Sequence, residues 1–182
     1  MAKVYAMIAD GTEEVECLTV VDLLRRAGIT TVLVSVGGKQ VKCSHNIVIQ
    51  ADATVGEVDL SDADLIYLPG GMPGAEHLAA CGKLVAAIGA QLKANKRVAA
   101  ICAAPAVVLG ANGFLRGKKA ICYPGFEEGC VGASVVSGAR VVTDGNITTS
   151  RGPGCSVDLG LELIGLLVGE KTAQSVKNAI QY

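Results

Sequence analysis

The chain has 182 residues with a formal net charge of −1, and 51% of its residues are hydrophobic. There is no long basic run, so the sequence indicates no nucleic-acid partner. No apolar stretch reaches the ~18 residues of a membrane-spanning helix, and no secretion signal is recognisable, so we expect a soluble, cytoplasmic protein without membrane contact. The length fits one domain, residues 1–182, with several elements buried on both faces.

Strands and helices alternate along the first half of the chain. The predicted elements are a strand at 3–9, a helix at 13–27, a strand at 30–36, a hairpin at 40–50 and a strand at 64–68. The helix has acidic residues in its first turns and Arg25-Arg26 in its last, an order that suits the helix dipole.

The second half continues this alternation. We predict a helix at 83–95, a strand at 97–101, a short helix at 105–111, strands at 139–143 and 147–149, and helices at 154–168 and 171–180. The pattern favours one α/β domain with a largely parallel sheet and helices on both faces. In such sheets ligands bind beyond the carboxyl ends of the strands, where we expect the loops 10–14, 69–74, 102–105 and 150–154 to meet.

Cys102 lies where the apolar strand at 97–101 meets the small residues before Pro105. With Pro105 in the first helical turn, Cys102 occupies a sharp strand-to-helix turn. Free N–H groups at a helix N-terminus stabilise a thiolate, the nucleophilic and oxidisable form of cysteine. We therefore predict a reactive thiol at Cys102. Most of the other cysteines are interpreted as small core residues.

The sequence predicts no metal and no cofactor. Only His45 and His77 offer imidazole ligands, and the seven cysteines form no Cys-x-x-C pair, which argues against a zinc site and a disulfide scaffold. The run 150–154 precedes a predicted helix and is compatible with a bound anion. It lacks the third glycine of a dinucleotide fingerprint, and no Gly-Lys-Ser/Thr run occurs, so a nucleotide is not expected.

Glu16, in the first turns of the helix at 13–27, is expected at the same rim as Cys102. Ionised, its carboxylate raises the pKa of the thiol; protonated in a dry pocket, it donates a hydrogen bond to a thiolate or an oxidised sulfur. The alternative is that Glu13, Glu14 and Glu16 are surface charges that complement the helix dipole.

Gly70-Gly71 follows the predicted strand at 64–68. Backbone N–H groups without side-chain bulk, together with the N–H of Ala103, would form an oxyanion hole facing Cys102. An ordinary glycine turn is the alternative.

Five segments, read together, resemble the ThiJ/PfpI superfamily and, within it, the DJ-one branch. In the family's order they are Glu13-Glu14-Val15-Glu16, Arg25-Arg26-Ala27-Gly28-Ile29, Leu68-Pro69-Gly70-Gly71, Ala99-Ala100-Ile101-Cys102-Ala103-Ala104-Pro105 and Thr149-Ser150-Arg151-Gly152-Pro153-Gly154. The resemblance implies a homodimer with a flavodoxin-like three-layer sandwich, doubly wound around a mostly parallel sheet and similar to class I glutamine amidotransferases.

The same resemblance implies the roles of individual residues. Cys102 would be a nucleophile-elbow cysteine with a strained backbone, hydrogen-bonded by a protonated Glu16. Gly71 and Ala103 would supply the backbone donors. Asp22 matches an acidic position close to the pocket in relatives.

Three positions depart from the family's pattern. Ala103 stands where protease-like members have a histidine, and Tyr123 stands where some relatives have a pocket histidine. Without a Cys–His pair, a cysteine-protease mechanism is poorly supported. His45 replaces a residue that is commonly arginine, near Cys43, which matches a second family cysteine close to the dimer interface.

Two functions remain in contention, with a third less favoured. In the first, Cys102 attacks the aldehyde of glyoxal or methylglyoxal, Glu16 moves a proton, and a hydroxy acid such as lactate forms without a cofactor. A related activity is that of a deglycase, which removes such carbonyl adducts from amino groups. Both activities would protect against carbonyl stress. In the second, the protein is a non-catalytic, chaperone-like stress protein, and a peroxide oxidises Cys102. A peptidase or amidotransferase is less favoured, because the sequence offers no histidine paired with Cys102 to act as the general base.

Overall fold

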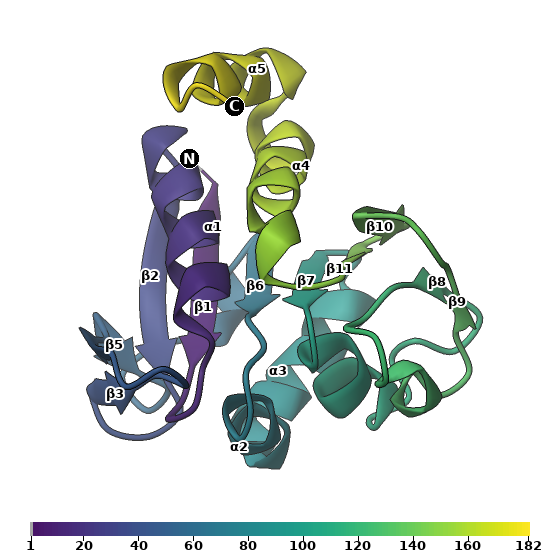
Figure 1. The fold of residues 1–182 in the computed structure, drawn as a ribbon. Helices are drawn as coiled ribbons and strands as arrows, with labels where there is room; N and C mark the ends of the chain where they lie inside the picture. Colours follow the sequence, from purple (N-terminus) through teal and green to yellow (C-terminus); the bar gives the residue numbers. More distant parts are fainter. Residues whose placement is uncertain (1) are drawn as a thin grey trace.

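The computed structural model describes residues 2–182, which form a seven-stranded central sheet flanked by helices (Figure 1). In spatial order the strands are β10 (Val141–Asp144), β11 (Ile147–Ser150), β7 (Arg97–Ile101), β6 (Leu65–Leu68), β1 (Lys3–Ile8), β2 (Thr30–Ser35) and β5 (Ala53–Thr54). Neighbouring strands are parallel except for the antiparallel pair of β10 and β11. The predicted flavodoxin-like, mostly parallel architecture is confirmed.

Helices cover both faces of this sheet. One face is covered by α1 (Glu14–Arg26), α4 (Ser156–Val168) and α5 (Glu170–Ala179), with α1 and α4 packed side by side (Figure 1). The other face is covered by α2 (Gly74–Ala80), α3 (Gly82–Lys93) and η2 (Pro105–Gly110), a short π-type helix. The layers are therefore helix, sheet and helix.

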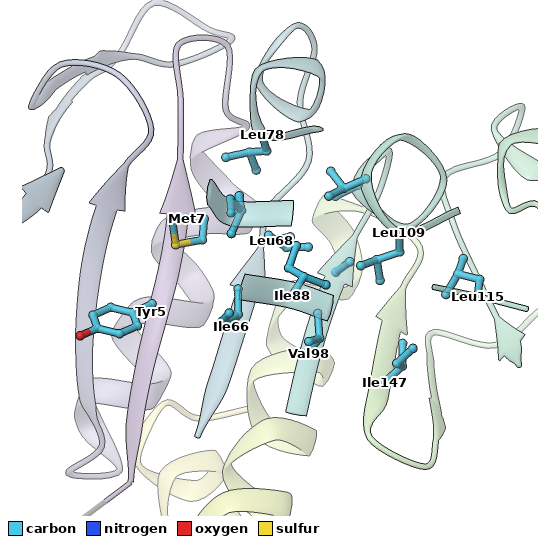
Figure 2. Close-up of a cluster of buried hydrophobic side chains, with 14 of the residues drawn as sticks. Tyr5, Met7, Ile66, Leu68, Leu78, Ile88, Val98, Leu109, Leu115 and Ile147 are labelled. Atoms are coloured by element: carbon cyan, nitrogen blue, oxygen red, sulfur yellow. The ribbon is translucent and has the colours of Figure 1, made fainter. Parts of the chain in front are cut away.

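The core follows from strict alternation along the strands, because successive side chains point to opposite faces of a sheet. On β1, Tyr5 and Met7 join one buried cluster, while Val4, Ala6 and Ile8 join the other. Figure 2 shows the first cluster, in which strand residues meet leucine and isoleucine side chains from the covering helices. Because these strands are buried on both faces, their sequences are continuous apolar runs.

Shorter elements complete the fold. They are the antiparallel hairpin of β3 (Gln40–Lys42) and β4 (Val48–Gln50), the parallel pair of β8 (Lys119–Ala120) and β9 (Ser134–Val135), and the 3₁₀ turns η1 (Leu60–Asp62), η3 (Glu127–Gly129) and η4 (Pro153–Cys155). The predicted hairpin at 40–50 is confirmed. Within residues 2–182 no helix has the length and apolarity needed to cross a bilayer; a cytoplasmic location stays a prediction.

Several elements were not predicted. The segment after β6 was read as a loop because it is rich in glycine and proline, yet α2 begins at Gly74, directly after a cis Met72–Pro73 bond and without a side-chain cap. The pair of β8 and β9 and the strand β5 are two residues long each. Such short strands leave no periodic signal in a sequence.

Candidate active site

Cys102 directly follows β7 and has a φ of +64°, in the left-handed region that side-chain-bearing residues rarely adopt. Its N–H donates to the carbonyl of Ser150 at 3.0 Å, and its own carbonyl accepts from the N–H of Tyr123 at 2.8 Å. The backbone of Cys102 is thus held between the end of β11 and the segment after β8. The sharp turn expected from the sequence is present.

Glu16 lies on the first turn of α1 with no exposed surface, and hydrogen bonds hold its backbone and one carboxyl oxygen. Its Oε2 accepts from the N–H of Gly70 at 2.8 Å, its carbonyl accepts from the hydroxyl of Tyr67 at 2.9 Å, and its N–H donates to Glu13 Oε2 at 2.6 Å. Within residues 2–182, Glu16 Oε1 is buried without a hydrogen-bond partner. The polar side chain that interacts with this carboxyl is the thiol of Cys102.

The interpretation of the glutamates as surface charges is wrong. Glu13 is 8% exposed, Glu14 is 4% exposed and Glu16 is fully buried. Glu13 caps the helix through the N–H of Glu16, and Glu14 accepts from the backbone N–H of His45 at 3.1 Å. These acidic residues therefore hold the loops of this rim together.

Gly70 lies directly between Cys102 and Glu16. A Cβ built on Gly70 would lie 2.7 Å from Cys102 Cβ and 2.8 Å from Glu16 Oε2, closer than real atoms approach. The adjacent Gly71 has a φ of +87°, and a Cβ there would collide with the backbones of Gly11 and Glu13. Both positions require glycine, so the reading of this segment as an ordinary turn misses its role in bringing thiol and carboxyl together.

The carboxyl and the thiol influence each other's protonation. Burial raises the pKa of Glu16 from 4.5 to about 7, although the Cys102 thiol and the N–H of Gly70 act in the opposite direction. Burial and the charge of Glu16 raise the pKa of Cys102 to about 12, while backbone N–H groups of Ala103 and Gly71 hydrogen-bond the sulfur and act against this rise.

The expectation that the helix N-terminus alone makes Cys102 a thiolate is therefore wrong while Glu16 is ionised. Once Glu16 is protonated, its charge no longer opposes the thiolate and the two N–H donors remain. A protonated carboxyl with a thiolate carries the same net charge as a carboxylate with a thiol, so transfer of one proton within the pair separates the two states.

A cavity of about 230 Å³ lies against two segments that are hydrogen-bonded to the backbone of Cys102. It is lined by Tyr123, Pro124, Arg140 and the segment 151–155. Both walls are tied to Cys102, because Tyr123 donates to its carbonyl and Ser150, which precedes the segment, accepts from its N–H. A Cβ on Gly152 would lie 3.1 Å from the Tyr123 ring, so a glycine lets the ring pack on this wall.

The two arginines of the cavity differ. Arg140 forms an ion pair of 2.7 Å with Asp158 and also donates to the carbonyl of Gly154. Arg151 is half-buried, and within residues 2–182 its guanidinium makes no hydrogen bond or ion pair. An unpaired guanidinium beside a pocket favours anionic or carbonyl-oxygen groups.

The remaining predicted residues lie elsewhere. Asp22 is exposed on α1 and pairs with Arg26 at 2.6 Å, so no described contact brings its carboxylate to Cys102, and its role stays a prediction. His77 Nδ1 lies 2.9 Å from the carbonyl of Asp10, and His45 Nδ1 lies 3.2 Å from Glu14 Oε2. Neither of the chain's two histidines contacts Cys102.

Glu13, Glu14 and His45 each place one ligand atom within 4.8 Å of the others. Glu14 already accepts from Ser44 Oγ at 3.1 Å, and the His45 side chain is 71% exposed. Hydrogen bonds account for this cluster, and we assign no metal to it.

Sequence reasoning missed Tyr67, whose hydroxyl holds the first turn of α1 against β6. A signal was available, because a tyrosine in a fully buried strand needs a partner for its hydroxyl. It also gave no reason to single out Thr149, whose Oγ1 accepts from the N–H of Ile121 at 2.9 Å and so anchors the segment before Tyr123.

The fold and this site define a flavodoxin-like protein with a cysteine on a strained turn directly after a central strand. Residues 2–166 match the DJ-1/PfpI family, and the chain belongs to that family. It is 38% identical over 179 residues to protein DJ-1 homolog B from Arabidopsis thaliana, covering 98% of this chain but only 41% of that protein, so the chain spans less than half of this relative.

Two further relatives match along nearly their whole length. The glutathione-independent glyoxalase DJR-1.2 from Caenorhabditis elegans is 30% identical over 169 residues, which cover 92% of this chain and 90% of that protein. The structure of oxidized DJ-1 from Toxoplasma gondii superposes with a TM-score of 0.96 at 35% identity, covering 100% of this chain and 99% of the other.

Proposed function

We propose that the protein is a cofactor-independent enzyme that converts small reactive carbonyls such as methylglyoxal to hydroxy acids, with Cys102 as nucleophile and Glu16 as proton shuttle. The observation that carries this proposal is the pair itself. Gly70 brings a buried carboxyl against a thiol that receives two backbone N–H groups. The similarity to a glutathione-independent glyoxalase supports the same reaction class.

The first step is attack of the Cys102 sulfur on the aldehyde carbon. The C=O π electrons move to oxygen, and the resulting hemithioacetal oxygen takes up a proton. The N–H groups of Gly71 and Ala103 already point at the sulfur, so they lie where a developing oxyanion next to it is stabilised. Removing one such donor typically costs about 10²-fold or more in rate.

Glu16 then moves a proton within the intermediate. Its carboxylate removes the proton from the former aldehyde carbon and returns it to the neighbouring ketone carbon. The hydroxyl proton of the hemithioacetal passes to the former ketone oxygen, which leaves a thioester beside a hydroxyl group. Water cleaves the thioester, releasing the hydroxy acid and the thiol. Aldehyde oxidation and ketone reduction balance within one molecule, so no external electron carrier is needed. A pKa of about 7 suits Glu16 to both directions of transfer at neutral pH.

The cavity lined by Tyr123, Arg140 and the segment 151–155 has a size that fits small carbonyls. Its volume of about 230 Å³ admits a substrate of a few heavy atoms. Arg151 supplies an unpaired guanidinium for a carbonyl oxygen or for the carboxylate of the product. Removal of carbonyl adducts from amino groups, and so protection against carbonyl stress, uses the same attack and is part of this proposal.

The test is lactate formation from methylglyoxal without added thiol, for wild type, Cys102→Ser and Glu16→Gln. Omitting thiol prevents spontaneous hemithioacetals from counting as turnover. Multiple turnovers that disappear in both variants support the two roles. A folded, reduced wild type that forms no lactate would refute the proposal.

A redox-sensing role is the second candidate, and one observation favours it. Two backbone N–H groups and a protonatable Glu16 surround the sulfur, and these are donors for the oxygens of a sulfinate. Peroxide-dependent oxidation of Cys102 in a protein without carbonyl turnover would select this role. A peptidase or amidotransferase is disfavoured, since neither histidine contacts Cys102.

We also propose that the chain forms a homodimer through α1 and the hairpin of β3 and β4. Val15 and Leu18 on α1 and Ile47 and Val48 at the hairpin are between 39% and 60% exposed, and these two elements are joined by the contact between Glu14 and His45. Apolar side chains gathered at one place favour association. Sedimentation equilibrium of wild type and Val48→Asp tests this: a dimer that becomes a monomer supports it, and a monomeric wild type refutes it.

A further inference from the structure

Two more cysteines lie close together beside the elbow. Cys122 and Cys130 are both free thiols, 3% exposed, and belong to the same buried cluster. The two thiols lie close enough that each influences the pKa of the other. Neither residue has a role in the carbonyl reaction proposed above.

The chain between the two cysteines forms consecutive turns. Phe126 donates to the carbonyl of Tyr123 at 3.1 Å, Gly129 donates to Phe126 at 2.9 Å, and Cys130 donates to Glu127 at 3.0 Å. These turns keep the segment between the two thiols compact.

The loop is also the part of this region that reaches solvent. Residues 123–129 are exposed or half-buried, whereas the cysteines at both ends are buried. Local opening of a surface loop costs less than global unfolding, so it gives a small oxidant access to thiols that are otherwise covered. The two sulfurs then meet again when the loop closes.

We propose that Cys122 and Cys130 are a dithiol redox site, separate from Cys102, which a peroxide converts to a reversible intramolecular disulfide. Hydrogen peroxide oxidises one thiol to a sulfenic acid and leaves as water. The second thiol attacks the sulfenic sulfur, the S–S bond forms, and the sulfenic oxygen leaves as a second water. The two sulfurs lose two electrons in total and the peroxide gains two.

The position of the pair gives the disulfide a consequence for the pocket. Tyr123 directly follows Cys122, lines the cavity and donates to the carbonyl of Cys102. A cross-link between the two ends of the loop restricts the segment that forms this wall. The oxidised pair is therefore expected to hold the cavity in its closed-loop shape.

The sequence offers a direct readout. Trypsin cleaves after Lys119 and after Arg140, and the peptide Ala120–Arg140 contains Cys122 and Cys130 and no other cysteine. Full-length folded protein is treated with hydrogen peroxide, alkylated, digested without reductant and analysed by mass spectrometry. We expect this peptide unalkylated and lighter by two hydrogen atoms, and doubly alkylated when dithiothreitol precedes alkylation.

Variants separate this pair from other cysteine chemistry. Cys122→Ser and Cys130→Ser each abolish the mass loss, whereas Cys155→Ser, at an equally buried cysteine, retains it. Cys102→Ser also retains it, so the result is independent of whether the carbonyl reaction occurs. Full alkylation of both cysteines in peroxide-treated, folded wild type would overturn the proposal.

An equilibrium measurement tests whether the fold itself favours the pair. In glutathione buffers, prepositioned thiols form their disulfide with an equilibrium constant about tenfold larger in the protein than in the synthetic peptide Ala120–Arg140. An equal or smaller constant in the protein would show that the fold opposes the disulfide, and would also overturn the proposal.

Discussion

Cys102 and Cys122 have thiols whose pKa is raised to about 12, and at both positions burial is the largest cause. The second cause differs. At Cys102 it is the charge of Glu16, and at Cys122 it is the neighbouring thiol of Cys130. Because Glu16 itself has a pKa of about 7, the charge that opposes thiolate formation at Cys102 is removed by one proton near neutral pH.

The hydrogen-bonding groups around the two thiols also differ. Backbone N–H groups of Ala103 and Gly71 hydrogen-bond the sulfur of Cys102, whereas the polar partner of Cys122 is a second thiol. One site is thus arranged to stabilise negative charge on sulfur or oxygen, and the other is arranged to join two sulfurs. A similar pKa at two cysteines therefore says little about their reactivity until its causes are separated.

The largest expected effect comes from Gly70→Ala, which removes the contact that defines the Cys102 site. The new methyl group overlaps Cys102 Cβ and Glu16 Oε2, so thiol and carboxyl must move apart. We expect turnover of methylglyoxal to fall about 10³-fold. Gly38→Ala is the matched control, because a Cβ there meets nothing within 4 Å. Near-normal activity in Gly70→Ala would show that close contact of the pair is unnecessary.

The next effect is on stability and comes from the raised pKa of Glu16. Between pH 4.5 and about 7 the unfolded chain ionises this carboxyl while the folded protein keeps it protonated, so the unfolded state binds fewer protons. The free energy of unfolding therefore falls as pH rises through this window, by roughly 3 kcal/mol. Glu16→Gln should lack this fall. Urea unfolding of both proteins at pH 4.5 and pH 8 gives the difference, and parallel behaviour would contradict the assignment.

A smaller effect is expected on the thiol of Cys102. In Glu16→Gln the charge that opposes the thiolate is gone, so the pKa of Cys102 should fall by about one unit or more. The pH dependence of its alkylation by iodoacetamide measures this shift. Asp22→Asn, which removes an exposed carboxylate paired with Arg26 on the same helix, should leave the profile unchanged. A shift there would instead support the pocket role that the family resemblance assigns to Asp22.

Much of the fold was predictable, because strands buried on both faces are continuous apolar runs in the sequence. The ends of helices such as α1 were predictable from acidic residues in the first turn, basic residues in the last turn and a glycine directly after it. The meeting of four loops at the carboxyl ends of the strands was predictable from parallel topology alone. The helix α2 was not, because its start is encoded by glycine and proline, which ordinarily indicate a turn.

The site was predictable as a set of residues but not in its electrostatics. Cys102, Glu16 and Gly71 were expected together, and the structure brings them together. A raised thiol pKa was foreseen only as the effect of an ionised Glu16, because a single sequence does not show the burial that raises both pKa values. The contact between Cys122 and Cys130 depends on loop turns with no regular spacing, and these too are invisible in the sequence.

The smallest expected effect concerns Tyr67, which supports the Cys102 site without touching the sulfur. Its hydroxyl donates to the carbonyl of Glu16 from a fully buried strand, so Tyr67→Phe leaves that acceptor without its donor and costs about 1 kcal/mol of stability. If the bond also positions Glu16, turnover should fall a few-fold while the KM for methylglyoxal is unchanged. Tyr182→Phe, at a tyrosine 51% exposed, is the control. Loss of stability with unchanged turnover would restrict Tyr67 to a structural role, because the carboxyl would then be positioned by Gly70 and the helix cap alone.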